Sequence, residues 1–167
     1  MLSASSNFDQ QNRSQYSSLK DIFINNTNPN SPNPVDEEIP IGYVLDKLHQ
    51  LGPRYLGDKS TAFAELHIEG IENKPFWVHK EYLVLQSTFF QQVFNTIKNS
   101  GECFTIKIPS PETFEPIFEY LYDGNADKWF DTITVDNCHQ VWENVEFLGL
   151  SHEARAICLS FIQNNFE

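Results

Sequence analysis

A chain of 167 residues, 40% of them hydrophobic and 14% aromatic, is long enough to bury a core, and its length suits one domain with some sequence left over. Its 23 acidic and 11 basic residues give a net charge of -12, which repels phosphate backbones and anionic lipids, so we expect neither nucleic acid nor a membrane as a partner. No apolar run approaches the roughly 20 residues that a membrane helix needs, and the N-terminus lacks the features of a secretion signal.

The three cysteines of the chain are Cys103, Cys138 and Cys158, an odd number without a CxxC pair. A domain of this size does not need disulfides for stability, so this usage fits a reducing environment. We therefore expect a cytoplasmic or nuclear protein.

The first 38 residues are rich in Ser, Asn, Gln and Pro, with few apolar side chains to offset the entropy lost on ordering. We predict a disordered tail over residues 1–38 and one folded domain over residues 39–167. A small apolar island at residues 19–24 of the tail is either a docking motif that folds on a partner or a transient helical turn.

The predicted domain begins with a helix and a β-hairpin. The apolar residues of IGYVLDKLHQLGPRYL recur at helical spacing until Gly52-Pro53 interrupts the pattern. The β-rich runs AELHIEG and PFWVH then flank a polar, turn-forming stretch at residues 71–74, which predicts a hairpin.

Two short helices and a further strand are predicted next. The apolar residues of HKEYLVLQSTFFQQVFNTI follow helical spacing, and Ser87 is placed to cap the second helix of a helical hairpin. FTIKI carries Phe104, Ile106 and Ile108 on one face, as a half-buried strand does, before Pro109 ends it.

The rest of the chain is predicted to be helical. Ser110 as N-cap, with a proline at the first helical position, opens a helix over TFEPIFEYLYD that Gly124 ends. After a polar stretch, Thr134 can cap a helix that Gly149 closes, and Ser151 opens the last one. Together these elements predict an α+β fold class, in which helices cover a small sheet.

Two blocks of this sequence resemble the signature of the BTB/POZ family. In the first, FWVHKEYLVLQSTFFQQVF, the signature positions are Phe76, His79, Leu83, Leu85, Ser87, Phe89, Phe90 and Phe94. The second, FTIKIPSPETFEPIFEYLYDGNAD, is similar to the family's strand and following helix with an aromatic-rich YLY-x-G close, at the expected distance from the first. VWENVEFLGLSHEARAICLSFI resembles the family's last helix pair, so the resemblance covers most of the chain.

This resemblance implies the BTB/POZ fold, a small mixed β-sheet capped by a cluster of α-helices that includes helical hairpins. It also implies a scaffold for homodimers or higher oligomers and, in many members, recruitment to a cullin-RING ubiquitin ligase. A voltage-channel type tetramerisation domain is close in fold, but the helices after Gly124 suit the longer BTB form. We therefore expect protein partners, self-association and a cullin as a candidate partner.

In dimeric BTB members, an Asp in the first strand region pairs with a basic residue beside the signature His in a charged pocket at the dimer interface. Lys80 supplies the base in this sequence, whereas Phe63 replaces the Asp. Because a buried ammonium without an anion is costly, we expect Lys80 to reach solvent or another carboxylate such as Glu65. The interface or pocket that the resemblance predicts comprises Leu45, Leu48, Phe63 and Lys80.

Members that bind a cullin often carry a hydrophobic-x-Glu triplet after the second helix of the hairpin. The matching stretch here is Ile97-Lys98-Asn99, which keeps the apolar anchor and lacks the Glu. Apolar anchors can carry much of the binding energy of an interface, while polar groups at its rim add less. The predicted cullin face comprises Ile97, Lys98, Asn99 and Tyr122.

The sequence shows no catalytic, metal-binding or cofactor-binding motif. It has no GxGxxG, P-loop or GxSxG, and its His and Cys residues show no zinc-type spacing. His79 is expected to hydrogen-bond nearby backbone from a partly buried site, and the glutamates of residues 112–119 to face water. We therefore expect no enzymatic activity and no cofactor.

The resulting hypothesis is a protein-interaction module that self-associates and acts as a substrate adaptor of a cullin-RING ubiquitin ligase. The alternative is a structural oligomerisation scaffold without a ligase role, which the missing Glu of the triplet favours. Since the sequence ends at Glu167 without a second domain, an adaptor is expected to contact its substrate through the tail, its own surface or a partner subunit.

Overall fold

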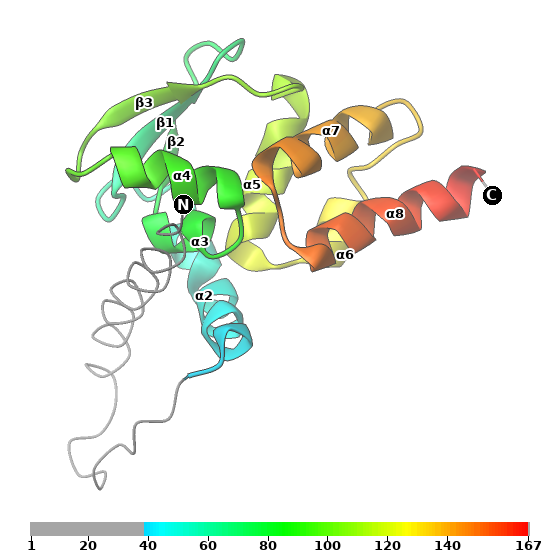
Figure 1. Ribbon diagram of the computed structural model, residues 1–167, viewed down its shortest axis with the longest axis horizontal. Helices are drawn as coiled ribbons and strands as arrows, with labels where there is room; N and C mark the ends of the chain where they lie inside the picture. Colours follow the sequence, from blue (N-terminus) through cyan, green and yellow to red (C-terminus); the bar gives the residue numbers. More distant parts are fainter. Residues whose placement is uncertain (1–38, 167) are drawn as a thin grey trace, which may run out of the picture. The chain divides into compact units, whose positions relative to one another are not determined.

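The computed structural model describes residues 39–166, and the predicted tail over residues 1–38 lies outside the described residues. A small three-stranded sheet is covered by helices, with α7 and α8 packed as a pair at the end of the molecule away from the sheet (Figure 1). This is the α+β architecture that the sequence predicts. None of the helices in residues 39–166 has the length and apolar character needed to cross a membrane.

The sheet is built around β1 (Ala64–Ile68), with strand order β2-β1-β3. β2 (Phe76–Val78) pairs with β1 in an antiparallel manner, which confirms the predicted hairpin, and β3 (Cys103–Ile106) pairs with β1 in parallel. β1 buries every second residue against the helices and leaves Glu65 and His67 partly exposed on the other face. The sheet therefore has one core face and one face toward solvent.

The first described helix, α2 (Ile41–Tyr55), continues through Gly52-Pro53, so the predicted break there is wrong. Pro53 lies in the last turn, where the amide of Leu56 still donates to the carbonyl of Gly52 at 2.9 Å. Gly52 is buried, and a Cβ at this position would overlap the backbone carbonyl of Tyr122. The glycine therefore serves the close approach of α2 to a later helix and does not end its own helix.

The helical hairpin consists of α3 (Lys80–Val84) and α4 (Thr88–Thr96). Ser87 caps α4 as predicted, because its hydroxyl oxygen accepts from the Phe90 amide at 3.1 Å. The same hydroxyl donates to the Leu148 carbonyl at 2.6 Å, so the cap also joins the hairpin to a helix sixty residues further along the chain.

The helix α5 (Phe114–Asp123) follows a 3-10 turn, η1 (Pro111–Thr113), and ends at Gly124 with φ 63° as predicted. Ser110 lies at the N-cap of η1 and Pro111 at its first position, as predicted, but the Ser110 side chain makes no capping hydrogen bond. Its hydroxyl donates to the Glu112 carboxylate at 2.9 Å, and its amide donates to the buried side chain of Asn144 at 3.0 Å. The hydroxyl is thus engaged by the nearby Glu112, while the distant Asn144 binds the Ser110 backbone.

The remaining described helices are α6 (Ala126–Phe130), α7 (Cys138–Leu148) and α8 (His152–Phe166). The sequence predicts a polar stretch in place of α6, although Asn125 caps it by accepting from the Lys128 amide at 3.0 Å. A helix of five residues is too short to show a periodic apolar pattern.

The two caps predicted around the last helix pair have different outcomes. Thr134 lies one turn before α7, where it and Asn137 each accept a hydrogen bond from the other's amide, at 3.2 and 2.8 Å, so α7 begins later than predicted. Ser151 does cap α8, since its hydroxyl accepts from the Ala154 amide at 3.4 Å. Gly149, with φ 57°, closes α7 as predicted.

Candidate interaction surfaces

His79 lies between β2 and α3 and is 6% exposed. Its Nδ1 is 2.9 Å from the Tyr122 hydroxyl and its Nε2 is 2.8 Å from the Thr61 hydroxyl, while its backbone amide donates to Tyr122 at 2.8 Å. The sequence predicts backbone partners for this ring, but both partners are side-chain hydroxyls. Burial lowers the pKa of the imidazole, so the neutral ring joins the sheet edge to α5.

Tyr122 has no exposed surface, which corrects its prediction as part of a cullin-binding face. Its ring stacks on Tyr82 with centroids 4.3 Å apart, and the Tyr82 hydroxyl donates to the Leu48 carbonyl at 2.6 Å. Burial raises the pKa of both tyrosines, so both hydroxyls stay protonated and act as donors. Tyr122 is a core residue that ties α5 to α2 and α3.

The other predicted cullin residues lie in the loop after α4. Lys98 and Asn99 are exposed, whereas Ile97 is only 8% exposed and packs within its own chain. The Glu102 carboxylate folds back on this loop and accepts from the Asn99 amide at 3.3 Å. A carboxylate thus lies beside position 99 although the residue there is Asn. Sequence matching missed Glu102 because it looks for the acid inside the triplet.

The outer surface of α2 differs from the predicted one. Leu48 is buried within the chain together with Val44, so it is not available to a partner, and Leu45 is half-buried. The large exposed apolar residues of α2 lie instead in its first turn, where Ile41 is 47% and Tyr43 is 53% exposed. Helical spacing alone does not tell which of several apolar faces is buried.

Phe63 and Lys80, predicted to line a dimer pocket, contact each other. The Lys80 ammonium lies 5.7 Å from the centroid of the Phe63 ring, and no ion pair of Lys80 is present among residues 39–166. Glu65, the predicted carboxylate partner, is 2.7 Å from His67 instead. Because an aromatic face attracts a cation, the Phe that replaces the expected Asp still gives Lys80 a partner.

Leu85 and Phe89 of the first sequence block are half-buried, and its remaining signature residues form a buried set. Phe76 packs edge-on against Phe114 with centroids 5.1 Å apart, in the layer between the sheet and α5. The other members of this set, all below 9% exposed, are Leu83, Ser87, Phe90 and Phe94. These buried positions belong to the core of the domain.

The sequence profile of the BTB/POZ domain matches residues 59–165, which is more than half of the chain. The chain belongs to the BTB/POZ family. Two solved structures have a similar fold. The BTB domain of zebrafish PATZ1 shares 18% identity at a TM-score of 0.57, over 78% of this chain and 100% of that chain. The BTB domain of human gigaxonin shares 16% identity at a TM-score of 0.54, over 78% and 99%. At these identities the likeness shows the fold alone.

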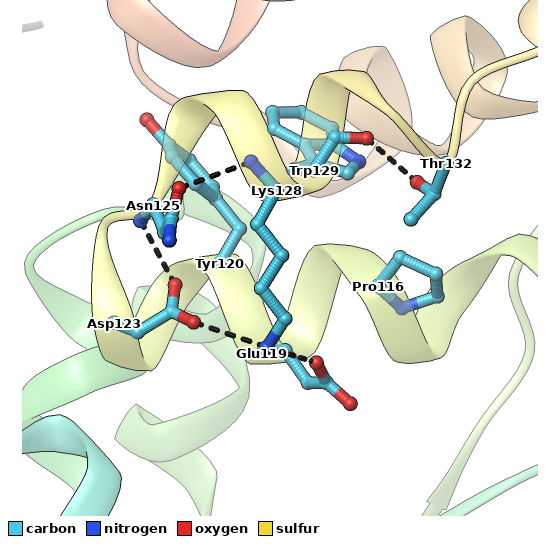
Figure 2. A pocket seen from close by; sticks show the side chains of 8 residues that line it. All are labelled: Pro116, Glu119, Tyr120, Asp123, Asn125, Lys128, Trp129 and Thr132. Carbon is cyan, nitrogen blue, oxygen red and sulfur yellow. Dashed lines mark hydrogen bonds and ion pairs between the residues drawn. The ribbon is translucent and has the colours of Figure 1, made fainter.

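A BTB/POZ domain is a protein-protein interaction module. One pocket on the surface of this domain lies between α5 and α6 (Figure 2). This pocket has an empty volume of about 180 Å³ and is partly open to solvent. The indole nitrogen of Trp129 is buried there, and it has no hydrogen-bond partner among the described residues.

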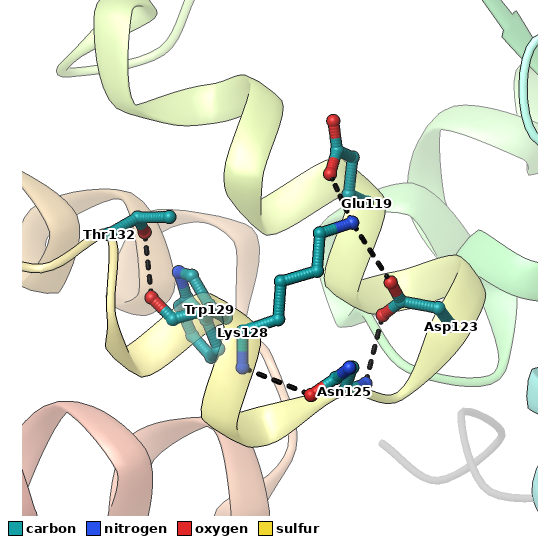
Figure 3. A network of polar contacts seen from close by, with 6 residues as sticks. All are labelled: Glu119, Asp123, Asn125, Lys128, Trp129 and Thr132. Atoms are coloured by element: carbon teal, nitrogen blue, oxygen red, sulfur yellow. Dashed lines mark hydrogen bonds and ion pairs between the residues drawn. The ribbon is translucent and has the colours of Figure 1, made fainter.

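An exposed polar network crosses the mouth of the same pocket in this BTB/POZ domain (Figure 3). The Lys128 ammonium contacts Glu119 at 2.7 Å and Asp123 at 3.3 Å, so it bridges α5 and α6. The hydrogen bond to Glu119 and then the one to Asp123 raise the pKa of Lys128. One ammonium thus bridges two carboxylates across the exposed rim between the two helices.

Proposed function

We propose that this BTB/POZ protein self-associates through the first turn of α2 and presents bound partners to a cullin-RING ubiquitin ligase through the loop after α4. It acts by binding rather than by catalysis, in the cytoplasm or the nucleus. The observation that carries the proposal is the exposure of two large apolar residues, Ile41 and Tyr43, in the first turn of a helix that is otherwise packed on its own domain through Val44, Leu48 and Gly52.

The first turn of α2 supports self-association because it exposes two large apolar side chains. α2 buries Val44, Leu48 and Gly52 against the rest of its own domain, which leaves Ile41 and Tyr43 without a role in that core. Ile41 and Tyr43 are two residues apart and lie on different sides of this turn, so a partner that packs on the exposed end of α2 would cover both. A second copy of the same helix, with the same apolar turn, suits a symmetric contact.

The loop after α4 supports the cullin part of the proposal through Glu102. Its carboxylate lies at hydrogen-bond distance from the amide of Asn99, next to the position where cullin-binding relatives carry a Glu in the triplet. Lys98 and Asn99 are exposed beside it. The acidic group that the triplet lacks can thus be supplied from three residues further along.

The alternative, an oligomeric scaffold without a ligase role, is favoured by the burial of Ile97. An anchor residue of an interface inserts into a pocket of the partner, and a side chain that is 8% exposed offers little surface for that. The two functions share the self-association step and differ only in cullin binding, so one set of measurements separates them.

Self-association is tested by light-scattering mass of the full-length chain across a range of concentrations. The double variant Ile41→Asp, Tyr43→Asp is expected to lower the mass to that of a monomer, because charges on the apolar turn oppose burial. Leu159→Asp, an exposed apolar residue on α8, is the matched control and should leave the mass unchanged. A wild-type monomer at all concentrations, or loss of assembly in the control alone, contradicts the proposed interface.

Cullin binding is tested by titrating an N-terminal cullin fragment against the full-length chain. We expect saturable binding that Glu102→Gln weakens at least about tenfold, in line with the loss of one charged contact. Glu72→Gln, which changes an exposed carboxylate in the β1–β2 turn, is the control. Absence of binding by the wild type at micromolar concentrations would leave the scaffold as the function.

A further inference from the structure

We propose that Glu65, His67 and Cys103 bind a transition-metal dication, Zn(II) in the first place, on the solvent-facing side of the sheet. One carboxylate oxygen, one imidazole nitrogen and the thiol sulfur of these residues all lie within 4.8 Å of one another. The site is separate from the α2 turn and lies next to the loop after α4, because Cys103 follows Glu102.

The backbone of two paired strands holds the three side chains together. Glu65 and His67 are alternate residues of β1 and so point to the same face of the sheet. β3 pairs with β1 in parallel, with Cys103 directly opposite Glu65. Glu65 donates from its amide to the Glu102 carbonyl at 3.0 Å, which holds this end of the strand pair in register.

The distances between the three ligand atoms suit tetrahedral coordination of an ion after the side chains adjust. Zinc binds sulfur at about 2.3 Å and nitrogen or oxygen at about 2.0–2.2 Å, so ligand atoms around it lie roughly 3–4 Å apart. The His67 Nε2 and Glu65 Oε1 atoms are 2.7 Å apart, hydrogen-bonded to each other, and part-exposed side chains can separate by the required fraction of an ångström. The hydrogen bond already orients the imidazole and the carboxylate toward a common point.

The donor set selects the class of ion. A thiolate with an imidazole is a borderline-soft combination that favours Zn(II) over Mg(II) or Ca(II), which prefer oxygen ligands only. The side chains of Glu65 and His67 are each 32% exposed and Cys103 is exposed, so the fourth position is open to water. The net charge of -12 attracts cations to the protein as a whole.

Sequence spacing could not reveal this site, because Cys103 follows His67 by 36 residues and the ligand atoms meet only through the parallel pairing of β1 and β3. The sequence prediction of no metal site rests on local His and Cys spacing, which finds ligands on one loop or helix. A site across two strands has no such pattern.

Thiol protection tests the site in the full-length chain. Cys103 is the exposed cysteine, while Cys138 and Cys158 are buried, so alkylation of the native protein reports on Cys103 first. One equivalent of Zn(II) is expected to slow this alkylation at least tenfold. His67→Gln and Glu65→Gln should abolish the protection, and both replace side chains on the solvent-facing side of the sheet, where folding is little affected.

His139→Gln is the matched control, because His139 is exposed and lies 3.4 Å from Glu143, as a second His-Glu surface pair without a cysteine. This variant should keep the full protection. Co(II) provides a direct signature, since coordination by Cys103 gives a thiolate-to-cobalt charge-transfer absorption that Cys103→Ser should remove. Equal protection in His67→Gln, no charge-transfer absorption in the wild type, or loss of binding in His139→Gln would each overturn the proposal.

Discussion

Buried polar groups have hydrogen-bond partners on one side of α5 and lack them on the other, within the described residues. On the side facing α2 and α3, Gln86 donates to the Leu121 and Tyr82 carbonyls at 2.7 Å each and contacts His49 at 3.1 Å. On the side facing α6, the buried indole nitrogen of Trp129 has no partner within residues 39–166. The contact of α5 with α2 and α3, the α2–α5 seam, is thus held by hydrogen-bonded polar groups. The contact of α5 with α6, the α5–α6 seam, is held by packing.

This difference predicts where substitutions should lower the free energy of unfolding most. A buried hydrogen-bonded group is costly to disturb, because its former partner is left unsatisfied away from water. The polar contacts of the α5–α6 seam lie at its exposed rim, where Lys128 bridges Glu119 and Asp123 and water can replace each contact. We therefore expect large effects at the α2–α5 seam and small ones at the α5–α6 seam.

The largest effect is expected for Gly52→Ala. The added Cβ overlaps the Tyr122 carbonyl, which belongs to backbone and cannot rotate away, so α2 and α5 must separate. We expect a loss of about 3 kcal/mol or more in the free energy of unfolding, measured by urea denaturation. Gly42→Ala is the matched control in the same helix, since nothing lies near its Cβ, and it should be neutral or stabilising by up to about 1 kcal/mol. Equal effects of the two variants would contradict the close contact.

Two tyrosines on α5 allow a direct comparison of the seams. Tyr122→Phe removes a hydroxyl that accepts from the His79 amide and contacts the His79 ring, so we expect a loss of about 1–3 kcal/mol. The Tyr120 ring stacks on Trp129 in the other seam, and its hydroxyl makes no hydrogen bond to the described part of the chain. Tyr120→Phe should cost less than about 0.5 kcal/mol, with both variants measured by the same urea denaturation. A larger loss for Tyr120→Phe than for Tyr122→Phe would contradict the difference between the two seams.

His79 should make the α2–α5 side of the molecule sensitive to pH. Burial lowers the pKa of its imidazole from 6.5, while the unfolded chain takes up the proton near that ordinary value. Below about pH 6.5 the unfolded state therefore binds more protons, and stability falls as the pH falls, by at most about 1.4 kcal/mol per pH unit, until the folded-state pKa is passed.

This pH dependence is measured as the free energy of unfolding between pH 7 and pH 5. His79→Gln is expected to be less stable throughout but to show a flatter slope, because the titrating group is gone. His139→Gln, which removes an exposed histidine, should keep the slope of the wild type. An unchanged slope in His79→Gln would mean that another group titrates in this range.

The smallest effect is expected for Lys128→Met. The substitution removes both ion pairs at the rim of the α5–α6 pocket but keeps the length of the side chain. Because the ammonium is about half exposed, we expect a loss below about 1 kcal/mol that shrinks further at high salt. A loss as large as that of Gly52→Ala would show that the rim network holds α6 in place.

Several features of this protein were determined by the sequence alone. The hairpin of β1 and β2, the cap at Ser87 and the ends of helices at Gly124 and Gly149 all follow from short patterns, and the structure confirms each one. Alternating polarity, a hydroxyl at a helix start and a left-handed glycine act over a few residues, so local sequence is enough to predict them.

Tertiary structure alone decided where the polar groups go. Asn144 accepts a hydrogen bond from the Ser110 amide, Tyr122 is buried against His79, and Phe63 contacts Lys80. Each outcome depends on which residue of a distant part of the chain packs at that position. A buried polar group without a hydrogen-bond partner costs free energy, so these contacts are made. The meeting of β1 and β3 at the Glu65 cluster has the same origin, because a parallel strand pair needs a long connection that no local pattern encodes.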